Sequence, residues 1–237
     1  MRGRGTGAPL TRDTVGQMST VGTSDPGIEP PVGVPRWPAT IALLAVGILL
    51  AIAATQLDVS SLQLPLVIIG ILAVPLTLAS IYGRHDIRHR LGMIALAILT
   101  AAVALSAVYL VRQLLYGVIE APSLLAGSAA IWGANLGTFA LWYWEIDGGG
   151  PSERRRDGHK STDFLFPQMQ VGDGTSTGGW WPGFLDYLFV AFNASSAFSP
   201  TDTLILSRRA KILMMVQSLI SLVTVVVIAA RAINTLK

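Results

Sequence analysis

Five long stretches of uncharged, mostly apolar residues constrain this chain more than any other feature of its sequence. Each is 19 to 23 residues long, and they occupy positions 38–57, 62–83, 91–111, 122–144 and 212–230. At a rise of about 1.5 Å per residue, such stretches form helices of about 28–35 Å, which matches the hydrocarbon core of a bilayer. The sequence therefore predicts an all-α integral membrane protein with five transmembrane helices.

The composition points to the same class of protein. Only 13% of the residues are charged and 51% are hydrophobic, whereas about a quarter of the residues in an average soluble domain are charged. A net charge of +3 is too small for a nucleic-acid-binding protein, and the absence of cysteine excludes disulfides and thiolate metal sites. None of the five stretches contains an acidic, basic or histidine residue, so we expect no catalytic residues, no metal site and no cofactor.

The alternation of polar and apolar segments divides the chain into four regions. Residues 1–36 contain five prolines and no apolar run, which predicts a disordered polar N-terminal tail. A membrane region of four helices is expected at 37–144, followed by a soluble loop at 145–182. The last region, 183–237, combines a short apolar segment with the final transmembrane helix.

The distribution of Lys and Arg predicts the orientation in the membrane. With a cytoplasmic N-terminus, the tail, the turn at 84–90, the loop at 145–182 and the start of the last helix place fourteen of them inside. Only Arg112, Arg231 and Lys237 are then left outside. By the positive-inside rule, this indicates a multi-pass protein of the cell (inner) membrane with its N-terminus in the cytoplasm.

A short uncharged segment precedes the last helix. Residues 187–201 lie between Asp186 and Asp202 and as a helix would reach about 22 Å, too short to span a bilayer comfortably. Its first part is apolar, and its second part is small and polar and contains Pro200. Two interpretations follow: a re-entrant segment sheltered by neighbouring protein, or an interfacial helix lying flat on the membrane, anchored by Trp180 and Trp181.

This segment resembles the pore loop of the potassium-channel superfamily. The two end residues, Asp186 and Asp202, and also Leu188 and Phe189, fall in register with that loop, and a basic cluster and a long apolar helix follow. The filter position differs, because Phe198-Ser-Pro-Thr201 replaces the family's Val-Gly-Tyr-Gly. The chain is similar to bacterial multi-pass membrane proteins of unknown function with such pore-like C-terminal hairpins. With a cytoplasmic N-terminus, this segment would enter the membrane from the cytoplasmic side, whereas the pore loop of potassium channels enters from the opposite side. We follow the charge count for orientation.

The resemblance implies a pore-loop channel that passes a small monovalent cation and is built from several copies, four if it forms a pore. Hydroxyl, amide or carbonyl ligands are then expected from Asn193, Ser195, Ser196 and Ser199. Phe198 becomes a hydrophobic constriction and Asp202 a charge at the mouth, with Pro200 and Thr201 completing the filter-like stretch.

The last helix and the fourth span carry two further patterns. Gln217, Ser221 and Thr224 recur at i, i+4 and i+7 and form a polar stripe that faces either a wet cavity or a partner helix. Gly133 and Gly137 have the spacing that lets two helices approach closely, within or between subunits, and Asn135 between them offers a hydrogen bond across the contact.

At the end of the fourth span, Glu145 and Asp147 are expected either to pair with Arg84 or Arg88 or to be solvated. The alternative to a channel is a non-conducting membrane scaffold or accessory protein, in which the polar stripe holds helices together. A small-solute transporter is the third option, weakened by the lack of charge in the spans.

Overall fold

The computed structural model describes residues 37–58, 85–117, 119–151, 153–154, 162–170, 180–196 and 202–235. This part is mostly helical and contains four helices long and apolar enough to cross a membrane: α1 (Trp37–Gln56), α3 (His85–Tyr116), α4 (Ala121–Ile146) and α7 (Arg208–Thr235). These four correspond to four of the five predicted spans, as expected of a membrane-embedded protein. The predicted span at 62–83 and the predicted tail at 1–36 lie outside the described residues.

Shorter elements connect the last two long helices. A 3₁₀ turn, η2 (Asp147–Gly149), continues α4, and the chain then passes through β1 (Phe164–Leu165), α5 (Pro167–Gln170), α6 (Phe184–Ser196) and β2 (Leu204–Ile205). The helix α6 has 13 residues and is therefore about 20 Å long. It contains all of the apolar part, 187–192, of the short segment predicted at 187–201.

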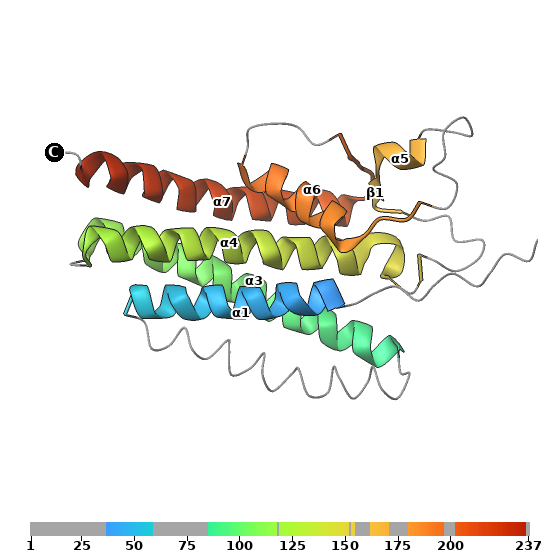
Figure 1. Ribbon diagram of the computed structural model, residues 1–237, viewed down its shortest axis with the longest axis horizontal. Coiled ribbons are helices and arrows are strands. Elements are labelled where there is room, and N and C mark those ends of the chain that lie inside the picture. Colours follow the sequence, from blue (N-terminus) through green and yellow to red (C-terminus); the bar gives the residue numbers. More distant parts are fainter. Residues whose placement is uncertain are drawn as a thin grey trace, which may run out of the picture. The chain divides into compact units, whose positions relative to one another are not determined.

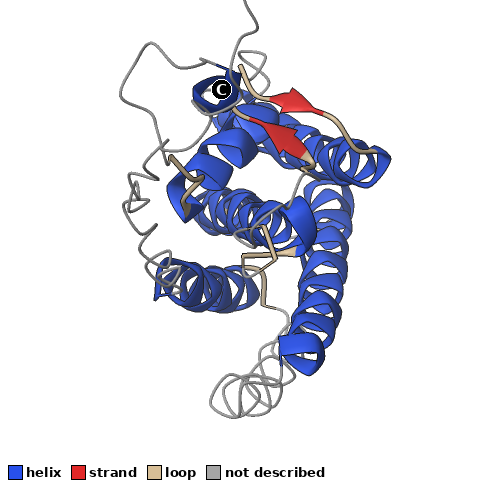
Figure 2. Ribbon diagram, turned by 90° about the vertical axis from the view of Figure 1, so that its right-hand side faces the viewer, coloured by secondary structure: helices blue, strands red, loops and turns tan. Residues whose placement is uncertain are grey.

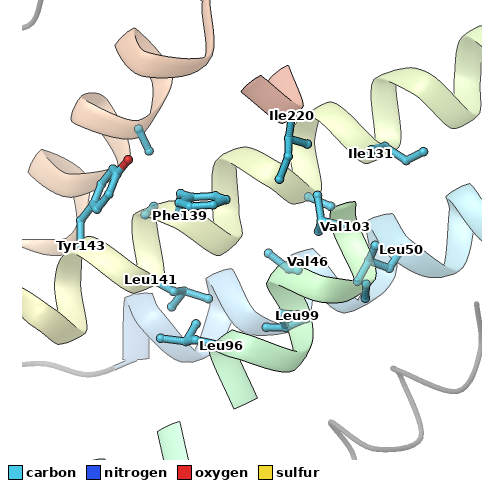
Figure 3. Close-up of a cluster of buried hydrophobic side chains, with 14 of the residues drawn as sticks. Val46, Leu50, Leu96, Leu99, Val103, Ile131, Phe139, Leu141, Tyr143 and Ile220 are labelled. Atoms are coloured by element: carbon cyan, nitrogen blue, oxygen red, sulfur yellow. The ribbon is translucent and has the colours of Figure 1, made fainter. Parts of the chain in front are cut away.

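Helix α4 lies at the centre of the bundle and contacts α1, α3, α6 and α7 (Figure 1). Figure 2 shows the bundle nearly along the helix axes, with α4 lying between the other helices. The core forms where their apolar side chains meet, as with Leu50 of α1, Leu99 and Val103 of α3, and Phe139 of α4 (Figure 3). The opposite faces carry exposed large apolar side chains, such as Leu44 and Ile48 of α1, which suits helices that contact lipid.

Helices α1, α3 and α7 run antiparallel to α4. We call the two ends of the bundle the Ala121 end and the Ile146 end, after the first and last residues of α4. Leu57, just after α1, contacts Gly127 near the Ala121 end. At the Ile146 end, His89 of α3 lies 3.5 Å from the Glu145 carboxylate. The start of α7 also lies at the Ile146 end, because Arg209 donates a hydrogen bond to the carbonyl of Ile146 at 2.9 Å.

Close packing of α1 on α4 depends on glycine. A Cβ atom on Gly137 would lie 2.5 Å from Cγ2 of Val46, and one on Gly133 would lie 3.1 Å from Cδ1 of Leu49. The absence of side chains at these two positions lets the helix backbones approach closely. The structure thus places both glycines of the Gly-x-x-x-Gly pattern in a contact within one chain.

The expectation of a purely helical chain was wrong in one detail. Strands β1 and β2 pair antiparallel, with Phe164 opposite Ile205 and Leu165 opposite Leu204. Strands of two residues leave no periodic pattern in a sequence. They form here because the backbone entering and leaving this end of the bundle needs hydrogen-bond partners where the helices no longer supply them.

We predict that Gly137→Ala lowers thermal stability, whereas the matched change Gly92→Ala does not. Alanine normally stabilises a helix interior by up to about 1 kcal/mol relative to glycine. At Gly92 a Cβ meets nothing within 4 Å, so that gain is expected in full. At Gly137 the clash with Val46 should turn it into a loss of about 1–3 kcal/mol. Thermal unfolding in detergent tests this, and equal shifts for both variants would contradict the packing.

Candidate functional site

Helix α6 extends from the Ile146 end to about the middle of α4. At its start, the Phe184 ring lies 5.9 Å from the ring of Trp144, near the end of α4. Near its end, the Phe192 ring packs edge-on against Trp132 at 6.1 Å. Trp132 lies about halfway along α4, so α6 runs antiparallel to α4 and stops halfway along the bundle.

The described chain resumes after α6 at the end from which α6 started. Asp202 is exposed and lies two residues before β2, which pairs with β1. The N–H of Leu206 then donates a hydrogen bond to the carbonyl of Asp163 at 2.9 Å. Phe184 and Asp202 therefore lie at the same end of the bundle, while Ser196 lies near its middle.

Gln217 of α7 holds the C-terminal half of α6. Its side chain is completely buried, and its Nε2 donates hydrogen bonds to the carbonyl of Ala191 and to the hydroxyl of Ser195, both at 2.7 Å. Its Oε1 accepts a hydrogen bond from the hydroxyl of Tyr143 on α4. One amide thus joins α4, α6 and α7, and we call Gln217 with its partners the glutamine clamp.

Two serines of α7 complete the end of α6. The last carbonyls of a helix have no partner within the helix. The hydroxyl of Ser218 donates to the carbonyl of Ala194 at 3.1 Å, and that of Ser221 donates to the carbonyl of Ser195. Ser221 in turn accepts a hydrogen bond from the indole N–H of Trp132 at 3.0 Å. The last carbonyls of α6 are therefore capped by side chains of α7.

The remaining members of the predicted polar patterns lie around the clamp. Thr224 is buried and bonds within its own helix, to the carbonyls of Ile220 and Ser221. Asn135 is fully buried on α4, and its Nδ2 donates to the carbonyl of Gln217 at 3.2 Å. The predicted polar stripe of α7 thus faces α6 and α4 of the same chain.

The predicted filter-like residues are placed only in part. Ser195 is buried in the clamp, whereas Asn193 and Ser196 are half-buried and share a local hydrogen bond of 3.3 Å from the Ser196 hydroxyl to the Asn193 carbonyl. Asp202 is exposed at the Ile146 end. The other four positions, Phe198, Ser199, Pro200 and Thr201, lie outside the described residues.

A second polar cluster lies at the Ile146 end, and we call it the edge cluster: Asp147, Arg154, Asp163, Tyr187 and Arg209. Asp147 is only 1% exposed, so the expectation that this carboxylate is solvated was wrong. It accepts hydrogen bonds from the backbone N–H of Asp163 at 2.8 Å, from the hydroxyl of Thr162 at 2.9 Å and from the hydroxyl of Tyr187. The side chain therefore fixes β1 and the first half of α6 to the end of α4.

Arg154 is buried and packs against the residues around Asp147. The guanidinium of Arg154 lies 4.4 Å above the ring of Trp144 and 5.0 Å from that of Tyr187, and donates to the carbonyls of Trp144 and Asp147. The chain reaches this position because Gly148, Gly149 and Gly150 all adopt positive φ values, which glycine tolerates without steric cost.

Asp163 and Arg209 connect β1 to the start of α7. The guanidinium donates two hydrogen bonds to the carboxylate, of 2.7 and 2.6 Å, and Gly148 donates a third from its backbone. Burial by itself would raise the pKa of Asp163. The hydrogen bonds from Arg209, Ser207 and Gly148 and the charge of Arg209 outweigh it, and together they hold the pKa of Asp163 below its ordinary value.

The edge cluster is electrically neutral as a set. Its carboxylates, Asp147 and Asp163, are matched by the guanidinium groups of Arg154 and Arg209. From the sequence, Arg154 was expected to contribute only to orientation, and Arg209 to orientation and to the basic cluster of the channel resemblance; the aromatic members of both clusters were not predicted. The residues whose roles were missed are Trp132, Tyr143, Arg154, Asp163, Tyr187 and Arg209. Only the Gly148-Gly149-Gly150 run, a few residues before Arg154, offered a local hint, because all the partners are distant in sequence.

No protein-family model, curated protein or solved structure matches this chain. Within the described part of the chain, no group of three acidic or histidine residues is arranged to hold a metal ion. The function is therefore argued from the position of α6 and from the two polar clusters.

We predict that Gln217→Leu destabilises the protein by about 2–3 kcal/mol, because it leaves the buried Ser195 and Tyr143 hydroxyls without their partner. Hydrogen exchange of the α6 backbone amides should become faster than in the wild type. Ser196→Ala is the matched control, since it removes only a local hydrogen bond of α6. Unchanged protection of α6 in the Gln217→Leu protein would show that the clamp does not hold this helix.

We predict that Asp163→Asn lowers thermal stability near neutral pH by about 1–2 kcal/mol, a loss limited by solvent screening of the partly exposed Arg209. Because the folded pKa of Asp163 is lowered, its contribution is complete above the ordinary aspartate value, about 4. It disappears as the pH falls through the folded pKa. The difference between the two proteins should therefore shrink on acidification.

The control for this measurement is Asp202→Asn, which alters an exposed carboxylate that receives no hydrogen bond from the described residues. It should change stability by less than about 0.5 kcal/mol. A difference between wild type and Asp163→Asn that grows as the pH falls would contradict the assigned role of the ion pair.

Proposed function

We propose that α4, α6 and α7 form a pore-loop-like module in which α6 is a re-entrant half-helix, and that the protein passes small monovalent cations through the membrane. One observation carries the proposal. Phe184 and Asp202 lie at the same end of the bundle, whereas Ser196, between them, lies near its middle. A flat interfacial helix would keep all three residues at one end.

The proposal includes five spans and a cytoplasmic N-terminus. The described chain breaks off after Asp58 at the Ala121 end and resumes with α3, whose His89 lies at the Ile146 end. This supports a crossing by the segment between them, which contains the apolar stretch 62–83. Trp37, at the start of α1, lies at the same end as Ile146, so the tail and the 145–182 loop are on one side, which the charge count makes cytoplasmic.

Cation preference follows from the direction of α6. A helix carries a partial negative charge at its C-terminal end, and half-helices that end within the membrane favour cations there. The end of α6 lies near the middle of the bundle, where fixed charges are absent from the described parts of the spans. Asp202, at the Ile146 end, adds a carboxylate where a cation would enter.

The passage itself requires several copies of the chain around an axis. Within one chain, the polar side chains beside α6 are directed into the clamp. The outer face of α6 exposes apolar residues, among them Leu185 and Phe189. We propose a homo-oligomer in the lipid bilayer, a tetramer by analogy with the channels that the segment resembles.

A second function, a non-conducting membrane scaffold, is favoured by one specific observation. The side chains of Gln217, Ser218 and Ser221 all donate hydrogen bonds to α6 of the same chain. The polar stripe therefore acts as the contact between helices that a scaffold requires, without a need for a wet cavity.

Cation flux distinguishes the two functions. Liposomes that contain the purified protein should leak a monovalent cation. The Asp202→Asn change should reduce this leak several-fold, because it removes the charge at the entrance. Glu120→Gln is the matched control, because Glu120 is an exposed acid at the opposite end of the bundle. Absence of any cation leak would favour the scaffold.

Whether both ends of the segment 183–202 lie on one side of the membrane is tested separately from conduction. The chain contains no cysteine, so single cysteines at Gly183, Asp202 and Glu120 can be probed with an impermeant thiol reagent. Positions 183 and 202 should react from one side of the membrane and position 120 from the other. Reaction of 183 and 202 from opposite sides would exclude a re-entrant α6, whatever the flux.

A further inference from the structure

One face of α7 combines exposed cations with an exposed apolar strip. Arg208 and Lys211 lie in its first turn and are exposed. Below them, at helical spacing, the strip continues with side chains that are 56–64% exposed: Ile212, Met215, Leu219 and Leu222. Successive members are one to four residues apart, so they share one face of the helix. We call these six residues the outer strip of α7.

The two cations of the outer strip are uncompensated. Arg209, between them, is paired with Asp163, whereas Arg208 and Lys211 make no ion pair with any residue in the described ranges. The first turn of α7 contains no acidic residue. The positive end of the helix dipole disfavours cations at this position. No carboxylate within the described ranges therefore neutralises these two charges.

The dimensions of the strip fit one leaflet of a bilayer. From Ile212 to Leu222 the helix rises about 15 Å, which is half of the hydrocarbon thickness of about 30 Å. Lys211 directly precedes Ile212 and Arg208 lies about one turn before it, where lipid headgroups would be. Leu204 and Leu206, which precede α7, are also about half exposed. Exposed apolar side chains are therefore present on both sides of Arg208 and Lys211 along the chain.

We propose that the outer strip binds an anionic phospholipid. Its phosphate contacts Arg208 and Lys211, and an acyl chain lies along Ile212, Met215, Leu219 and Leu222. A zwitterionic lipid is a poorer ligand, because its own ammonium group competes with the two cations for the phosphate and adds positive charge beside them. This site depends on the protein being embedded in a membrane and not on the proposed conduction.

Lipid selectivity at the strip can be measured directly, because the chain lacks cysteine. A Met215→Cys variant carrying a fluorophore is reconstituted in vesicles, and its quenching by nitroxide-labelled phosphatidylglycerol is compared with quenching by phosphatidylcholine of the same chain length. We expect a preference for phosphatidylglycerol of about fivefold, from the attraction of interfacial cations to anionic lipid. Raising the salt concentration should weaken this preference.

The double change Arg208→Gln and Lys211→Gln should reduce the preference to about one, whereas Arg112→Gln, at an exposed arginine of α3, should leave it unchanged. A fluorophore at Leu105, exposed on α3, reports the background selectivity of the bilayer.

Three results would overturn the proposal. One is equal quenching by the two lipids in the parent protein, and another is a preference that survives the double change. The third is weak quenching by both lipids together with self-quenching between labelled chains, which would show that a second copy covers the strip.

Discussion

The structure depends on how the chain completes the end of a helix that stops halfway along the bundle. Buried carbonyls without partners cost several kcal/mol each in an apolar environment, and the last carbonyls of α6 have no partner within their own helix. The glutamine clamp and the serines of α7 remove this cost: Ser218 and Ser221 cap the carbonyls of Ala194 and Ser195, while Gln217 bonds Ala191 and Ser195. The position of α6, and any function built on it, follows from these contacts.

The edge cluster performs the complementary task at the Ile146 end. A carboxylate buried there without partners would be expensive. Asp147 is instead surrounded by donors from β1 and α6, and Asp163 is held by Arg209 of α7. The phenol of Tyr187 belongs to the same helix as the clamped Ser195, so α6 is fixed at both ends, by charge at one and by amide and hydroxyl groups at the other. A segment fixed at both ends presents the same geometry in every copy, which an oligomeric passage requires and a scaffold also tolerates.

The two proposals rest on different faces of α7. The buried face meets α6 and determines whether a re-entrant segment exists, and the outer strip faces away from the bundle and concerns lipid. Arg209 separates them: it turns inward to Asp163, while Arg208 and Lys211 remain outside. Three neighbouring basic residues thus have two roles, which a count of charges for orientation does not reveal.

The sequence by itself determined the membrane class, four of the spans to within a few residues, and the presence of a helix too short to cross. These are local properties, because hydrophobic length is read from consecutive residues. It also singled out Gln217, Ser221 and Asn135 as unusual polar residues in apolar helices, but left open whether they face water or protein. Only the tertiary structure decided that, and it also decided that Asp147 is buried and that β1 pairs with β2. Their partners are 15 to 89 positions away along the chain, and no local pattern specifies which distant donor reaches a given acceptor once the helices pack.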